Sequence, residues 1–209
     1  MFFLPKIINF AKKKYMIINV GVFCASSSKI NKIYFDAAEK FGKILAENNL
    51  VCFTGAGNSG LMRTIQDSVL QNGGLCFGVI PQFMTDVGWC HLGLSETIVV
   101  KTMMERKAVL REKIDAAVFL AGGIGTLDEF FEILTLKQLG IFCKPIIILN
   151  TNSYYNELLK VLEKTVSENF MLEEHKRMWQ VVNSVDEILP AIAAAPDWKN
   201  ENIKLALLE

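Results

Sequence analysis

A glycine-rich turn between two apolar segments limits the possible folds of this chain more than any other feature. Residues 116–120 are apolar throughout, as expected for a strand buried on both faces of a sheet. Residues 126–140 continue with the apolar spacing of a helix. Between them lie Gly122, Gly123 and Gly125. A strand, a glycine turn and a helix in this order are typical of the βαβ units that build parallel sheets.

The same alternation continues along the chain and predicts an α/β protein, with a mostly parallel sheet that carries helices on both faces. We expect strands at residues 17–24, 50–54, 75–80, 96–100, 116–121, 145–149 and 179–182. We expect helices near 34–45, 61–69, 103–113, 126–140, 154–168 and 185–194. Residues 82–94 form the longest irregular stretch, and a connection of that length often forms a wall or lid of a binding site.

A chain of 209 residues without repeats or an internal linker suits one domain. We expect an N-terminal extension at 1–15, a single α/β domain at 16–195 and a C-terminal tail at 196–209. The extension places its apolar residues before its lysines, which is the wrong order for a signal peptide. No apolar run approaches ~18 residues, so we expect no membrane span.

Charge and cysteine usage disfavour several classes of protein. The 22 basic residues balance the 22 acidic ones, which argues against a nucleic-acid or membrane partner. Five cysteines without a C-x-x-C pair fit a reducing cytoplasm. Two histidines are too few for a clustered zinc site, and we expect no metal.

Three loops of small residues, at 25–28, 55–60 and 121–126, follow predicted strands and should meet at the carboxyl edge of the sheet. The last one leaves free backbone N–H groups at the positive end of a helix, where a phosphate binds well. Thr126 adds a hydroxyl, and Glu129 lies one turn into the helix. A plain tight turn and an acid that only balances the helix dipole remain the alternative interpretation.

Two further side chains each allow two interpretations. Arg106 opens a predicted helix and can clamp a phosphate or ribose, or it belongs to a solvated basic face. Trp89, in the irregular stretch, can stack on a base or simply anchor the loop.

Four motifs taken together resemble one family. They are Gly-x-Gly-x-x-Gly-Leu-Met at 55–62, Gly-Val-Ile-Pro at 78–81, Glu-Arg-Lys at 105–107 and Gly-Gly-x-Gly-Thr-x-x-Glu at 122–129. This arrangement is similar to the Lonely Guy family of cytokinin riboside 5′-monophosphate phosphoribohydrolases, whose members were often labelled lysine decarboxylases. The resemblance covers about residues 16–190.

The resemblance implies a Rossmann-like three-layer sandwich that forms a homodimer. It implies hydrolysis of the N-glycosidic bond of a purine ribonucleoside 5′-monophosphate, giving free base and ribose 5-phosphate. Neither a metal nor an organic cofactor is implied.

In that family, the matching arginine and glutamate, here Arg106 and Glu129, are catalytic. The expected substrate-binding residues are Lys107, Gly122, Gly123, Ile124, Gly125, Thr126 and Thr135, joined by Ser26, Gly55 and Gly57 from the other two loops. The segment 132–139 resembles the dimer face of the family, so the partner is expected to line the pocket.

The chain departs from the family pattern at several positions. Ala25 and Ala56 stand where glycine is usual, and their methyl groups are expected to narrow the pocket. Ala121 replaces a proline, and Met104 replaces a histidine. An acidic substrate contact in 82–94 has no firm match, and Asp86 is one candidate.

Two other functions remain open. A non-catalytic protein that binds a nucleotide or a nucleotide cofactor would need the same fold. A lysine decarboxylase would need a lysine that holds pyridoxal phosphate, and Lys107 offers no evident setting for that.

Overall fold

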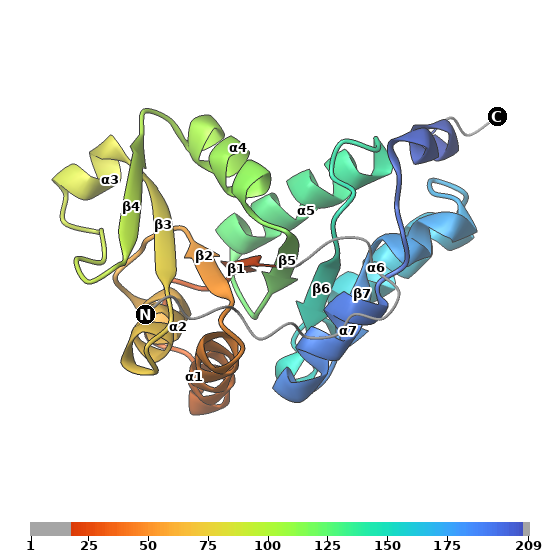
Figure 1. The fold of residues 1–209 in the computed structure, drawn as a ribbon. Coiled ribbons are helices and arrows are strands. Elements are labelled where there is room, and N and C mark those ends of the chain that lie inside the picture. The colour runs from red at the N-terminus through yellow and green to blue at the C-terminus, as the bar shows by residue number, and fades with distance from the viewer. Residues whose placement is uncertain (1–17, 207–209) are drawn as a thin grey trace.

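Seven parallel strands form one sheet, in the order β4-β3-β2-β1-β5-β6-β7 (Figure 1). The computed structural model describes residues 18–206, so the predicted extension at 1–15 lies outside the described residues. The strands are β1 (Asn19–Phe23), β2 (Val51–Thr54), β3 (Cys76–Pro81), β4 (Glu96–Val100), β5 (Ala116–Phe119), β6 (Ile146–Leu149) and β7 (Gln180–Val182). All the predicted strands are present, and the predicted α/β class is confirmed.

The helices are α1 (Lys32–Glu47), α2 (Gly60–Gln71), α3 (Gln82–Asp86), α4 (Met103–Lys113), α5 (Ile124–Gln138), α6 (Asn156–Ser167) and α7 (Ile188–Ala194). Two expectations need correction. The stretch 82–94 is not irregular throughout, because α3 begins directly after Pro81. A helix of five residues, none of them buried, has no apolar periodicity that a sequence pattern can reveal. The helix expected at 185–194 begins with a separate 3₁₀ turn at Val185–Glu187.

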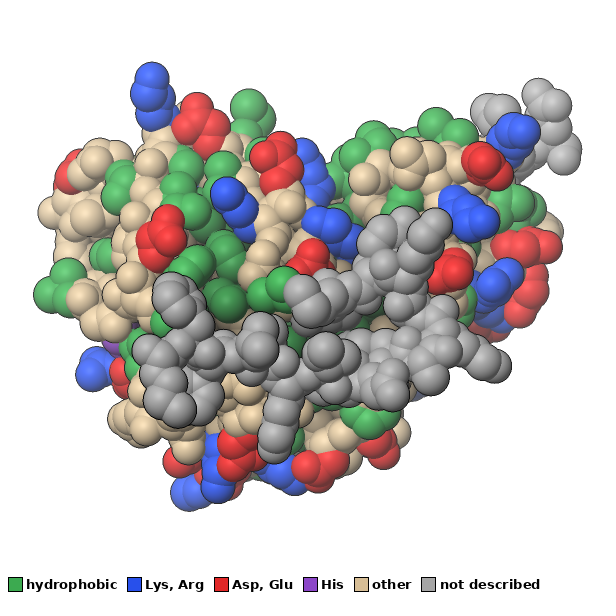
Figure 2. All heavy atoms as spheres, viewed as in Figure 1, with side chains coloured by type: hydrophobic (Ala, Val, Ile, Leu, Met, Phe, Trp, Pro, Cys, Tyr) green, Lys and Arg blue, Asp and Glu red, His purple; other side chains and the backbone are tan. Residues whose placement is uncertain are grey.

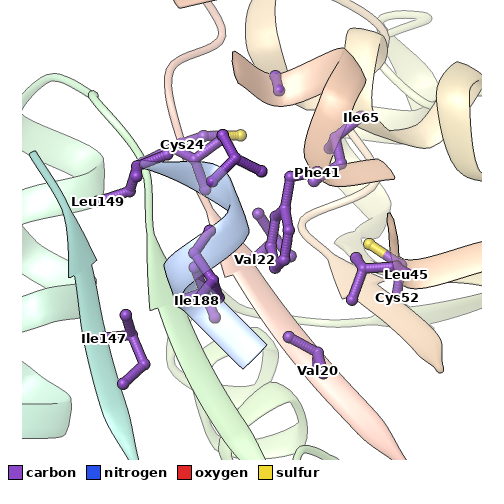
Figure 3. Packing of buried hydrophobic residues seen from close by; sticks show 14 of the residues in the cluster. Val20, Val22, Cys24, Phe41, Leu45, Cys52, Ile65, Ile147, Leu149 and Ile188 are labelled. Carbon is purple, nitrogen blue, oxygen red and sulfur yellow. The ribbon is translucent and has the colours of Figure 1, made fainter. Parts of the chain in front are cut away.

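Alternate residues of the strands face two separate cores, which makes the molecule three layers. Figure 1 shows α1 and α2 below the strands and α4 and α5 above them. On the lower face, Val20 and Val22 of β1 pack with Phe41 of α1 and Ile65 of α2 (Figure 3). Ile188 of α7 joins this core. Burial of each such side chain contributes about 1.5–3 kcal/mol.

The upper face is built largely from aromatic side chains. Phe23 of β1 stacks on Phe119 of β5 with ring centroids 4.7 Å apart, and Phe119 meets Phe130 of α5 edge-on at 5.2 Å. Trp198 is buried in the same core, and its Nε1 donates to the carbonyl of Lys137 at 2.6 Å. Part of the predicted tail therefore packs on the domain, and the boundary at residue 195 stays a prediction.

The strand order reverses between β1 and β5, and this reversal creates a crevice at one edge of the sheet. β2, β3 and β4 extend the sheet to one side of β1, whereas β5, β6 and β7 extend it to the other. The loops that follow β1 and β5 therefore part in opposite directions and leave a crevice outside the carboxyl ends of the strands. The two loops are joined at its base, where the amide of Ala25 donates to the carbonyl of Ala121 at 3.1 Å.

Charged side chains of both signs intermingle on the face seen in Figure 2, over the part that the described residues form. Within residues 18–206, no helix combines the length and the apolar character that a bilayer crossing requires.

Candidate active site

A pocket of about 560 Å³ opens at the carboxyl edge of the sheet. Four parts of the chain line it: the loop after β1, the loop after β2, the start of α4 and the glycine turn before α5. Met84 and Trp89 also line it. The predicted convergence of the three small-residue loops is thus observed, and α4 joins them.

The glycine turn presents open backbone donors to this pocket. Gly123 is the N-cap of α5 and has no side-chain cap, and the first intrahelical bond runs from the amide of Leu127 to its carbonyl. The amides of Ile124, Gly125 and Thr126 precede that bond and have no intrahelical acceptor. A Cβ added at Gly123 or Gly125 would meet no atom within 4 Å. This empty space in front of free amides suits an anion.

Gly122 has a different role from its neighbours, since it is buried and does not line the pocket. A Cβ there would lie 2.1 Å from Oγ1 of Thr126, so the absence of a side chain leaves room for that hydroxyl. Two tyrosines hold the turn from behind. Tyr154 donates to the carbonyl of Gly122 at 2.7 Å, and Tyr155 donates to that of Leu120 at 2.6 Å.

Arg106 is held against the loop after β2. Thr102 caps α4 by accepting from the amide of Glu105 at 3.1 Å, which fixes the first turn of the helix. From there Nε of Arg106 donates to the carbonyl of Val79 at 3.2 Å. A Cβ at Gly55 would lie 1.6 Å from Nη2 of Arg106, so the guanidinium rests directly on the Gly55 backbone. Gly55 therefore serves by accommodating the arginine.

Glu129 meets Arg106 inside the pocket. Oε1 of Glu129 lies 3.5 Å from Nη2 of Arg106, and the residues are only 8% and 7% exposed. Among the described residues, this Oε1 has no hydrogen-bond partner. Burial raises the pKa of the Glu129 carboxyl above its ordinary value, against the opposing charge of Arg106. A buried, under-bonded carboxyl on a pocket wall is typical of a functional group rather than a structural one.

Besides Gly122, the structure places two expected substrate contacts outside the pocket of this chain. Nζ of Lys107 is paired with Asp128 at 3.0 Å and with Glu132 at 2.5 Å, and these pairs raise its pKa, that with Glu132 the most. Thr135 is exposed on α5, beyond the turn that carries Glu129. Neither residue lines the pocket, so their substrate contacts stay predictions.

Ser26 and Gly57 do line the pocket, from the loops after β1 and β2. Ser26 is exposed there. The amide of Gly57 points to Sδ of Met62 at 2.9 Å. Sequence reasoning missed the methionines of the wall, Met62, Met84 and Met103, because isolated methionines give no pattern that distinguishes a pocket from a core.

Only some of the residues that depart from the family pattern lie at the pocket. Ala25 lines the pocket, as expected. Ala56 does not narrow it, because its side chain is fully buried against Ile80 and Cys90 behind the wall, with φ of 57°. Ala121 is buried, whereas Met104 is 77% exposed and outside the pocket.

The acidic candidate Asp86 also lies elsewhere. It accepts from the side chain of Gln82 on the surface of α3 and does not line the pocket. Within the described part of the chain, no group of three His, Cys, Asp or Glu side chains is arranged to hold a metal ion. The pocket offers amides, one guanidinium and two carboxyls, Asp128 and Glu129, as its strong polar groups.

Comparison with known proteins agrees with this geometry. A family model described as "Possible lysine decarboxylase" matches residues 62–192. The cytokinin riboside 5′-monophosphate phosphoribohydrolase of Rhodococcoides fascians is 37% identical over 175 residues, covering 83% of this chain and 88% of the relative. An Arabidopsis thaliana protein of the same name is 37% identical over 159 residues, covering 76% and 75%.

Solved structures share the fold at lower identity. The molybdenum cofactor binding protein of Rippkaea orientalis has a TM-score of 0.66 at 19% identity and covers 86% of this chain and 97% of that one. The molybdenum cofactor carrier protein of Chlamydomonas reinhardtii also has a TM-score of 0.66, at 18% identity, with 86% and 98% covered. These likenesses show the fold alone. The sequence relatives and the family model together show that the chain belongs to the Lonely Guy family of cytokinin riboside 5′-monophosphate phosphoribohydrolases.

Proposed function

We propose that the protein hydrolyses the N-glycosidic bond of purine ribonucleoside 5′-monophosphates, with adenine or an N6-substituted adenine as the base. The observation that carries this proposal is Glu129, a carboxyl that lines the pocket close to Arg106 and whose Oε1 accepts no hydrogen bond from the described residues. The names of the sequence relatives support it.

The 5′-phosphate binds at the amides of Ile124, Gly125 and Thr126, which holds the sugar one helical turn away, beside Glu129. The bond between C1′ and the base nitrogen breaks, and its electron pair leaves with the base. The oxygen of a water molecule bonds to C1′. The carboxylate of Glu129 stabilises the positive charge that develops on the sugar and accepts the proton of the water, which then passes to the departing base.

Arg106 serves as the cation of the site. Its guanidinium is fixed by Val79 and Gly55, so it is already in position before the substrate binds. It orients the ribose or phosphate and stabilises the negative charge on the leaving base. Burial raises the pKa of Glu129, and the charge of Arg106 opposes that rise and so favours the ionised carboxylate.

A nucleotide-binding protein without catalysis is the second candidate, and a molybdenum cofactor carrier protein has the same fold. A carboxyl beside a bound anion weakens binding, which favours the enzyme over a pure carrier. A decarboxylase is disfavoured. The residues of the described chain that line the pocket include no lysine for a Schiff base, and Lys107 is held in ion pairs outside it.

A homodimer completes the proposal. Phe131, Thr135 and Leu139 follow one another at intervals of four residues, so they share one side of α5. Phe131 is 42% exposed and Leu139 is 38% exposed, and an apolar stripe of this kind suits a partner helix. Pairing through this stripe would bring Thr135 toward the second pocket. The cytoplasm is the proposed location, supported by the free thiols of all five cysteines.

Substitution of either catalytic residue tests the reaction directly. We expect Glu129→Gln and Arg106→Ala each to lower AMP hydrolysis by at least about 100-fold, because each removes a charge that the transition state requires. Chromatography of free adenine measures the reaction, and Glu157→Gln on exposed α6 is the control. Tight AMP binding by the wild type without adenine release would favour the carrier.

The pH profile should carry the signature of Glu129. Only the ionised form of Glu129 is active, so kcat/KM should fall as the pH drops through the pKa of this carboxyl. Because that pKa is raised, the fall should have its midpoint above pH 4.5, the ordinary carboxyl value. The same shift favours the protonated folded state, so its contribution to stability is complete below pH 4.5 and is lost as the pH rises through the raised pKa. Glu129→Gln should therefore lack this loss in thermal unfolding. An acid limb at or below 4.5 would contradict the assignment.

Gly125→Ala separates folding from phosphate binding. The new methyl meets no protein atom, so we expect stability to be kept or raised by about 0.5 kcal/mol in this helical turn. The methyl enters the space proposed for the phosphate, and KM for AMP should rise at least about tenfold. Steady-state kinetics and thermal unfolding check the two halves, with Ser167→Ala in α6 as the control. An unchanged KM would place the phosphate elsewhere.

Phe131→Glu tests the dimer. A charge in the α5 stripe should give the sedimentation mass of one chain, whereas the wild type gives that of two. Val161→Glu, on α6 and 55% exposed, is the matched control and should leave the dimer intact. A Phe131→Glu protein that remains dimeric would exclude this face.

A further inference from the structure

Trp89 is an exposed aromatic residue on a firmly held segment. The residue is 55% exposed and lines the pocket. Its amide donates to the carbonyl of Met84 at 3.0 Å, and its carbonyl accepts from the amide of Asn58 at 3.0 Å. Nδ2 of Asn58 also donates to the carbonyl of Gly88 at 2.7 Å. The segment is thus bonded to the loop after β2, which itself lines the pocket.

The next residues reinforce this attachment. The amide of His91 donates to the carbonyl of Ala56 at 2.9 Å, and Gly57 forms an antiparallel bridge with Cys90. The ring of His91 is used structurally, because its Nε2 lies 2.8 Å from Asp67 of α2. Backbone hydrogen bonds therefore hold the segment around Trp89 without a contribution from the indole, and the ring is available to a ligand. This disfavours the interpretation that Trp89 merely anchors the loop.

Three of the residues that line the pocket together with Trp89 are methionines. Met62, Met84 and Met103 bring thioether side chains from three different elements to the same pocket. Thioethers pack adaptably and make favourable contacts with flat aromatic groups. The charged groups of the pocket, Arg106 and Glu129 among them, come from α4 and α5. The part of the lining that Trp89 and these methionines supply therefore suits an uncharged flat group.

The order of the strands sets the order of these groups. The glycine turn follows β5, Arg106 rests on Gly55 after β2, and Trp89 comes from the connection after β3. The backbone of Trp89 is bonded to Asn58 in the loop after β2, and β2 and β5 are separated by β1, which at about 4.8 Å per strand is about 10 Å. The pocket thus presents an anion site at the end of β5, and a guanidinium and an exposed aromatic ring two strand positions away, a separation that a nucleotide can bridge between its phosphate and its base.

We propose that Trp89 is the platform on which the purine base stacks, and that it determines the preference of this site for a flat aromatic base. This inference rests on the proposed function for the identity of the ligand. Stacking involves the π-face, which every base has. It therefore tolerates an apolar substituent at the edge of the base. Met62, Met84 and Met103 surround that substituent.

Binding to the Glu129→Gln protein, in which turnover is suppressed, tests the proposal by calorimetry with AMP and ribose 5-phosphate. Adding Trp89→Ala should weaken AMP binding about 5- to 150-fold, which is the loss of one stacked base. Ribose 5-phosphate has no base, so its Kd should change less than about twofold. Trp89→Phe keeps an aromatic face and should retain most of the affinity for AMP. An equal loss for both ligands, or no loss for AMP, would overturn the proposal.

Fluorescence provides a second readout that folding defects do not imitate. AMP should quench the indole emission of the protein with Trp89, and Trp89→Phe, which keeps Trp179 and Trp198, should lose that response. Quenching that persists in Trp89→Phe would contradict the proposal.

Failure of the proposed function looks different. AMP that binds through Trp89 but releases no adenine from the wild type would refute hydrolysis alone. Adenine release with normal AMP affinity in Trp89→Ala would refute the platform alone. No AMP binding at all would overturn both.

Discussion

The pairing of Arg106 with Glu129 at the floor of the pocket is the interaction on which the site depends. Both side chains are nearly buried, and a buried ion pair contributes little net stability because each charge loses its hydration. The pair persists because the surrounding fold holds it: Gly55 gives the guanidinium a place, and Val79 accepts its Nε hydrogen. The loss of hydration of the two charges falls at the proposed active site. There Oε1 of Glu129 has no hydrogen-bond partner among the described residues and is available to a ligand.

Glycines build the pocket in three distinct ways. Gly123 and Gly125 leave open space where a ligand can approach the backbone. Gly122 and Gly55 instead leave room for a protein side chain, Thr126 in one case and Arg106 in the other. Gly60, with φ of 61°, presses against the backbone of Ser26 and joins the loops after β1 and β2. One residue type thus supplies access, side-chain positioning and loop packing.

Much of the fold was predictable because each strand is a short apolar run between turn signals. The α-helix α3 escaped prediction because it is too short and too exposed to leave a periodic pattern. The glycine turn and Glu129 could be identified from their order after a strand. The partners of Lys107, by contrast, lie on α5, some twenty residues away, and no local pattern reveals such a pair.

The sequence by itself determined the element types, the parallel sheet and the chemical groups available at its carboxyl edge, since burial periodicity and glycine turns are local properties. Only the tertiary structure decided which groups meet. It set Arg106 on Gly55 and against Glu129, kept Lys107 and Thr135 out of the pocket of this chain, and brought Trp89 to a methionine-lined wall. These outcomes depend on strand order and helix packing, because they join residues that are distant in the chain and whose spacing carries no signal of their contact.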